Sequence, residues 1–64
     1  HKGENVSRYV NRFRVDDACE RLRGGATVTE AMLASGFNTK SNFNREFLRV
    51  VGQPPSKFVE SLEM

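Results

Sequence analysis

The sequence predicts an all-α fold built as one small domain. Glycines and prolines divide its 64 residues into four segments, and none of the segments shows the period-two alternation of a strand. Hydrophobic residues make up 38% and charged residues 28%, as in an ordinary globular domain. No apolar run approaches the ~20 residues that cross a bilayer. We therefore expect four helices and no membrane-spanning segment.

The first predicted helix, about Val6 to Arg23, is the longest. Asn5 is a suitable N-cap, and Gly24-Gly25 is a suitable C-terminal stop. At about 100° per residue, its apolar side chains change face near Arg14. The first face carries Val6, Tyr9, Val10 and Phe13, and nearly the opposite face carries Val15, Ala18, Cys19 and Leu22. Such a helix is expected to pack against two different bodies, one at each end.

The second predicted helix is short. Thr27 and Glu30 fit a capping box, with the threonine at the N-cap and the glutamate at N3. Val28, Ala31 and Met32 form its apolar stripe. The helix is expected to end by Gly36.

The third predicted helix runs to about Val51. Asn38 or Thr39 can cap it, and Gly52 ends it. Its apolar stripe consists of Phe43, Phe47 and Val50, and the opposite side carries Ser41, Asn42, Arg45 and Arg49. The fourth helix is predicted from Pro55, near N1, to about Leu62.

The second and third segments together predict a helix-turn-helix motif, because a tight turn around Gly36 joins a short capped helix to a longer one. In that motif the second helix lies in the DNA major groove. Arginine can bind guanine, and asparagine adenine, through two hydrogen bonds each. The same pattern also fits a generic helical module whose exposed charges are merely solvated, and the residues alone leave that alternative open.

Composition argues against catalysis. The only histidine is His1 and the only cysteine is Cys19, so the sequence lacks a disulfide framework, a cysteine zinc site and material for histidine chemistry. Asp16 and Asp17 diverge by about 100° on a helix and are interpreted as solvated surface charge. We expect no enzyme activity, metal or cofactor. The net charge of +2 and the pI near 9.1 permit an anionic partner.

Several motifs occur in register along the chain. They are Tyr9-x-Asn11-x-x-Arg14-x-x-x-Ala18, then Thr29-Glu30, then Gly36-Phe37-Asn38-Thr39-x-Ser41-x-Phe43-Asn44-Arg45-x-Phe47, and finally Gly52-Gln53-Pro54-Pro55-Ser56-x-Phe58. Together they resemble the AraC/XylS family of bacterial transcription regulators. The resemblance runs from about Gly3 to Phe58, and its run from Gly36 to Phe47 is fairly specific.

The resemblance implies a partial DNA-binding domain. Residues 1–25 would be a linker helix, and residues 26–64 a homeodomain-like three-helix subdomain, the second helix-turn-helix of the family. The first subdomain would be a missing partner, covering Val6, Tyr9, Val10 and Phe13. Double-stranded DNA would be the ligand, and the protein would be cytoplasmic, at the nucleoid. The chain begins with His, so we expect it to be part of a longer protein.

The family's contact sites carry over by position. The recognition helix, about residues 39–51, would contact bases through Lys40, Ser41, Asn42, Asn44 and Arg45. Phosphate contacts would come from Thr29, Thr39, Arg49 and Lys57. Arg14 matches a position that is usually basic in the family, and we interpret it as structural, in a surface or inter-subdomain salt bridge.

Four features depart from the family pattern. Ala31-Met32 replaces a large aliphatic followed by alanine, and Pro54 replaces a capping serine or threonine. Val59 stands where arginine often follows the aromatic Phe58. Leu48 stands where a basic residue is common, and its outward phase predicts a contact with the last helix or with a partner. The electrostatic part of DNA binding is thereby weakened.

A second interpretation is a helical protein–protein interaction module. Its docking site would be the face formed by Val6, Tyr9, Val10 and Phe13. If this face has no partner in the chain, it could also drive self-association, because exposed apolar patches tend to find partners.

Overall fold

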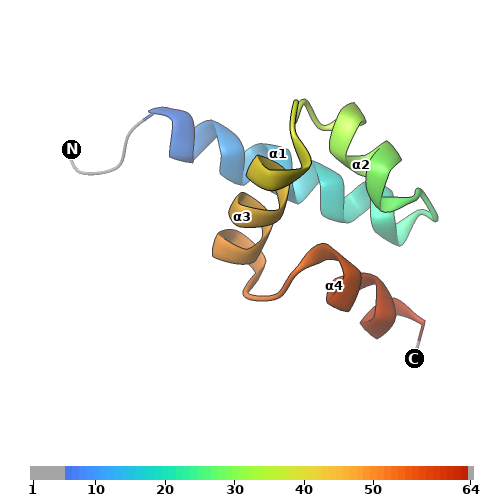
Figure 1. Cartoon of the computed structure of the whole chain (residues 1–64). Helices are drawn as coiled ribbons and strands as arrows, with labels where there is room; N and C mark the ends of the chain where they lie inside the picture. Colours follow the sequence, from blue (N-terminus) through green and yellow to red (C-terminus); the bar gives the residue numbers. More distant parts are fainter. Residues whose placement is uncertain (1–5, 64) are drawn as a thin grey trace.

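The computed structural model describes residues 6–63 and confirms the all-α prediction. The helices are α1 (Val6–Arg23), α2 (Val28–Ala34), α3 (Lys40–Val51) and α4 (Pro55–Leu62), and no strand occurs within the described range. Figure 1 shows α2, α3 and α4 gathered around the C-terminal half of α1, while the N-terminal half of α1 projects away from them. No helix between residues 6 and 63 is long and apolar enough to cross a membrane.

The change of face predicted along α1 is confirmed. Val15 and Ala18 are fully buried and Leu22 nearly so, whereas Val6 is 77% exposed and Phe13 is 57% exposed. Tyr9 and Phe13 stack edge to face on the projecting half, with their ring centroids 5.0 Å apart. Only the C-terminal half of α1 therefore contributes to the core of the described chain.

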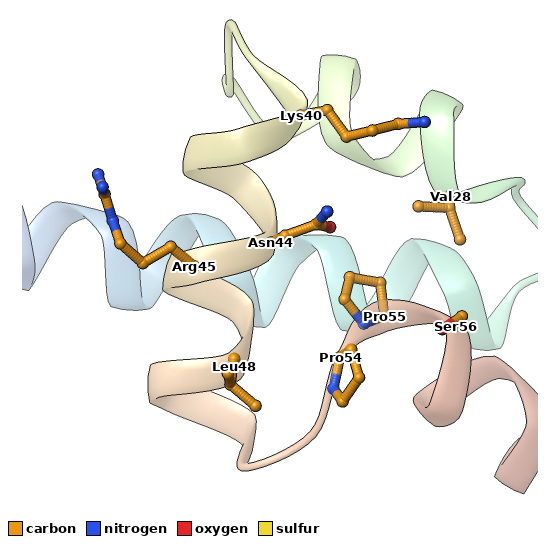
Figure 2. A pocket seen from close by; sticks show the side chains of 8 residues that line it. All are labelled: Val28, Lys40, Asn44, Arg45, Leu48, Pro54, Pro55 and Ser56. Atoms are coloured by element: carbon orange, nitrogen blue, oxygen red, sulfur yellow. The ribbon is translucent and has the colours of Figure 1, made fainter.

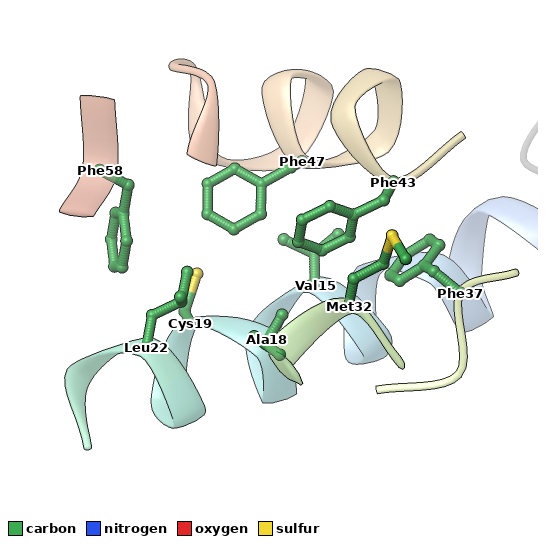
Figure 3. Close-up of a cluster of buried hydrophobic side chains, with 10 residues drawn as sticks. Val15, Ala18, Cys19, Leu22, Met32, Phe37, Phe43, Phe47 and Phe58 are labelled. Carbon is green, nitrogen blue, oxygen red and sulfur yellow. The ribbon is translucent and has the colours of Figure 1, made fainter. Parts of the chain in front are cut away.

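Phenylalanine rings form the centre of the core (Figure 3). Phe37 contacts Phe43 with ring centroids 5.2 Å apart, and Phe43 contacts Phe47 at 5.5 Å. Phe47 in turn contacts Phe58 at 5.5 Å, so that the rings connect the turn before α3 with α4. Edge-to-face and tilted pairs at this spacing add to the energy of burial.

Smaller side chains complete this core. Figure 3 shows the α1 side chains and Met32 of α2 packed against the rings. Cys19 lies among them, and its burial raises the pKa of the thiol, which favours a neutral, unreactive group.

Local signals fix the helix ends largely as predicted. The capping box is present, since Glu30 N–H donates to Thr27 Oγ1 at 3.1 Å and Thr27 N–H donates to Glu30 Oε1 at 2.9 Å. Of the two predicted caps for α3, Thr39 acts, accepting from the Asn42 amide. Gly52 closes α3 in the left-handed conformation. The predicted Asn5 cap lies outside the described residues.

The turn between α2 and α3 is tied to α1. Ser35 Oγ donates to the Ala31 and Met32 carbonyls at 2.6 and 3.1 Å, which closes the end of α2. Gly36 has φ +95°, and its carbonyl accepts a hydrogen bond from Arg14 Nη1 at 3.3 Å. Arg14 therefore has the structural role that we expected, but through a backbone hydrogen bond instead of the predicted salt bridge.

Replacing Gly36 by alanine should destabilise the fold by about 1–2 kcal/mol, because an L-residue is disfavoured at this left-handed φ. The added Cβ would also lie 3.3 Å from Arg14 Nε. The free energy of unfolding in urea, followed by circular dichroism, measures the effect. Gly24→Ala is the matched control, since its Cβ would meet backbone oxygens no closer than 3.5 Å. Equal stability of the two variants would contradict this account of the turn.

Candidate nucleic-acid interface

The inward side of α3 packs into the core, where Phe43 and Phe47 are fully buried. Four of its six exposed residues, Ser41, Asn44, Arg45 and Leu48, fall within an arc of about 100° on the opposite side, and Lys40 and Arg49 lie at its two margins. We call these four residues the outer face of α3. The core therefore fixes the rotation of the helix and leaves one continuous strip of α3 open to a ligand.

Arg45 is the cation of the outer face, and its side chain is 74% exposed. Its Nη2 donates to Asn42 Oδ1 at 2.8 Å, which restrains the guanidinium without burying it. Asn42 is itself only half-exposed. Of this predicted base-contacting pair, Arg45 thus points outward, while Asn42 is placed to orient it.

Arg49, predicted as a phosphate contact, lies toward α1. Its Nε and Nη2 donate to Glu46 Oε1 at 3.0 and 2.8 Å, and Nη2 also lies 3.4 Å from the Arg8 carbonyl. The guanidinium thus joins α3 to the N-terminal half of α1. Arg49 would therefore contact a phosphate only from the edge of the interface that lies next to α1.

Glu46 is a buried acid beside the candidate interface that the sequence reasoning did not single out. Its side chain is only 12% exposed, and it lies 2.8 Å from Arg49 and 3.8 Å from Arg45. An acid on α3 neutralises part of the positive charge that an anionic ligand such as DNA would meet on this helix. Its spacing of three residues from Arg49 was the available signal, because such pairs meet on a helix.

Beside the outer face lies an open groove of about 620 Å³ between α3 and the N-terminal ends of α2 and α4. It is lined by Val28, Lys40, Asn44, Arg45, Leu48, Pro54, Pro55 and Ser56. Figure 2 shows Lys40 and Asn44 extending over this groove, whereas the Arg45 side chain extends to the other side of α3. Three of the five predicted base-contacting residues thus line the groove, namely Lys40, Asn44 and Arg45, and Ser41 is exposed on the outer face.

Each of the four predicted phosphate contacts is a sequence neighbour of a residue that lines this groove. Thr29 lies in the first turn of α2 and is exposed, and Lys57 lies in the first turn of α4, 3.8 Å from Glu60. The Thr39 hydroxyl accepts from the Asn42 amide and still has its own proton to donate. No side chain caps α4 at Pro54, so the first backbone N–H groups of α4 have no acceptor within the helix.

Acidic side chains gather on a different element. Asp16, Asp17 and Glu20 of α1 line a second open groove with Val50, Val51 and Phe58. The Asp17–Arg21 pair is confirmed at 3.2 Å, and Glu20 pairs with Arg23 at 2.9 Å. These acids are surface charge, mostly paired, and the outer face of α3 keeps its positive character.

The chain combines a short capped helix, a glycine turn tied to α1 by Arg14, and an exposed helix face with amide, hydroxyl and guanidinium groups. Together these features define a helix-turn-helix module that binds DNA. A family model described as "Helix-turn-helix domain", of the AraC type, matches residues 1–61. The chain belongs to this DNA-binding family, which confirms the resemblance to AraC/XylS proteins, and the family is not an enzymatic one. No curated protein and no solved structure gives a match to the chain.

Glu46→Gln should raise the affinity for random-sequence duplex DNA severalfold at low salt and steepen its salt dependence, because it removes a negative charge beside Arg45 and Arg49. A titration of fluorescent duplex at several salt concentrations measures both changes. Glu20→Gln makes the same change of net charge on α1, next to Arg23, and should alter binding less. Equal effects of the two variants would mean that only net charge matters.

Proposed function

We propose that the chain is the C-terminal part of the DNA-binding domain of an AraC-type transcription regulator. In this proposal α1 is the linker helix, residues 26–64 form the second helix-turn-helix subdomain, and α3 lies in the major groove. The carrying observation is the outer face of α3, where an exposed guanidinium, an amide and a hydroxyl share one strip beside the groove. The mechanism is binding alone, with no chemical step.

Sequence would be read from the N-terminal turns of α3. Arg45 is positioned to donate two hydrogen bonds to guanine O6 and N7, with Asn42 limiting the rotamers of its guanidinium. Asn44 can pair with adenine N6 and N7, and Lys40 and Ser41 can each donate to an acceptor on a base edge. Lys40 makes no ion pair within residues 6–63, so its ammonium is available to DNA.

Register would be set by phosphates at the ends of α2 and α4. Both N-termini line the same groove, and a helix N-terminus favours an anion through its free N–H groups and its dipole. Thr29 and Lys57 would add a hydroxyl and an ammonium there, and Thr39 and Arg49 would add a hydroxyl and a guanidinium at the two ends of α3. Phosphate contacts position a protein on the duplex without carrying sequence information.

Arg45→Ala should weaken binding to a selected cognate duplex by about 1–3 kcal/mol and relax the preference at one base pair. The comparison uses binding isotherms of wild type and variant on that duplex and on its single-base variants. Arg21→Ala removes an exposed arginine of α1 and should leave the preference intact. If Arg45→Ala weakens binding to every duplex equally, Arg45 contacts phosphate and the assignment of base reading to it is wrong.

The projecting half of α1 supports a second proposal. Val6, Tyr9 and Phe13 are each more than half exposed, and they form a patch that no described residue covers. We propose that the first helix-turn-helix subdomain of the longer protein packs on this face. Without that subdomain the same face makes the chain a helical protein–protein interaction module that can self-associate.

Phe13→Ser should abolish concentration-dependent self-association while leaving the affinity for DNA within about twofold, because Phe13 lies off the outer face of α3. Sedimentation velocity over a dilution series measures the association. Leu62→Ser, at an exposed leucine of α4, is the control. A wild type that stays monomeric at all concentrations would contradict the self-association part of the proposal.

A further inference from the structure

The lower half of the groove beside α3 is apolar, in contrast to its upper half. Figure 2 shows Lys40 and Asn44 over the upper part and Leu48 beside Pro54 and Pro55 over the lower part. Leucine has no hydrogen-bonding group in its side chain, and the prolines have no backbone N–H to offer. The side chains of Leu48, Pro54 and Pro55 therefore cannot hydrogen-bond a phosphate or a base edge, and Ser56, at the start of α4, is the polar residue that lines this side of the groove.

Leu48 is nevertheless on the surface that faces DNA in the proposed function. It is 50% exposed, and it follows Asn44 and Arg45 by one helical turn on the same outer face. Three residues of helix advance by about 4.5 Å, comparable with the ~3.4 Å between successive base pairs. A helix that places Arg45 on one base pair thus places Leu48 close to the next one.

The major groove presents one apolar group, the C5-methyl of thymine, and apolar side chains that contact it distinguish thymine from cytosine. Two cations that line the same groove, Lys40 and Arg45, precede Leu48 on α3 and would draw the DNA strand toward this helix. Single exposed leucines are common and need no explanation. Leu48 instead forms an apolar strip with Pro54 and Pro55 in a groove that Arg45, the arginine proposed to read a base, also lines.

We propose that Leu48 is a specificity-determining residue that packs against the C5-methyl of a thymine in the base pair next to the one that Arg45 contacts. The proposal rests on the proposed function, since it requires α3 to lie in the major groove. It assigns a base-reading role to a position where, by the family resemblance, a basic residue is common.

Replacing thymine by deoxyuracil tests the proposal, because it deletes only the methyl group. The duplex is the one that the wild-type chain selects from a random-sequence library, and each thymine in it is replaced in turn. One replacement should weaken wild-type binding about fourfold, the value of one buried methyl. Leu48→Ala should bind the thymine and uracil forms of that site equally, while any response to uracil elsewhere is kept.

Two further variants separate the alternatives. Leu33→Ala truncates an exposed leucine of α2 outside the groove and should keep the wild-type response to uracil. Leu48→Lys should lose the response to uracil and gain a steeper salt dependence, by up to about one unit of slope, as expected for one added phosphate contact. Circular dichroism confirms that each variant keeps the wild-type fold.

The outcomes distinguish this inference from the proposed function. If the chain selects a sequence and depends on Arg45, but Leu48→Ala responds to uracil at every position as the wild type does, then Leu48 does not read a methyl and only this inference fails. The same conclusion follows if no thymine in the selected site responds to uracil. If the chain selects no sequence at all, the proposed function fails and this inference fails with it.

Discussion

The packing of the phenylalanine rings on the C-terminal half of α1 is the interaction on which the rest of the structure depends. Phe43 and Phe47 are fully buried, and they are covered by Val15 and Ala18, which are also fully buried. Small side chains on α1 let the rings of α3 approach closely, as dense core packing requires. Because both rings lie on one side of α3, their burial sets the rotation of this helix and hence the direction of its outer face.

The polar contacts restrict further the orientation of α3, which the packing of the core determines. Arg14 reaches from α1 to the Gly36 carbonyl, so the turn that aims α3 is attached to the same helix that supplies the core. Arg49 makes a comparable link from α3 to the Arg8 carbonyl. Each hydrogen bond contributes about 1 kcal/mol net, much less than the burial of a phenylalanine. Their role is therefore to restrict the orientation of α3 more than to hold it in place.

Much of this fold is readable from the sequence because its signals are local. Gly24-Gly25, Gly36 and Gly52 mark the helix ends, and the Thr27–Glu30 box marks the start of α2. The two faces of α1 follow from periodicity. The partner of Arg14 and the burial of Glu46 do not follow from periodicity. Arg14 meets Gly36 across 22 residues of chain, and Glu46 is covered only once α3 packs on α1. Contacts of this kind exist only in the assembled tertiary structure.

The charge distribution explains how a chain with a net charge of only +2 can be a DNA-binding domain. The acids of α1 are mostly paired with their own arginines, whereas Lys40 and Arg45 remain exposed along the groove. Glu46 pairs with Arg49 and neutralises part of its charge, and Leu48 and Val59 take positions where the family often has cations. With fewer phosphate contacts, sequence-independent affinity falls, and a larger share of the binding energy must come from the bases. In the proposed function, discrimination between sites would then depend on the few side chains of the outer face, and a second subdomain in the neighbouring groove would supply the remaining affinity.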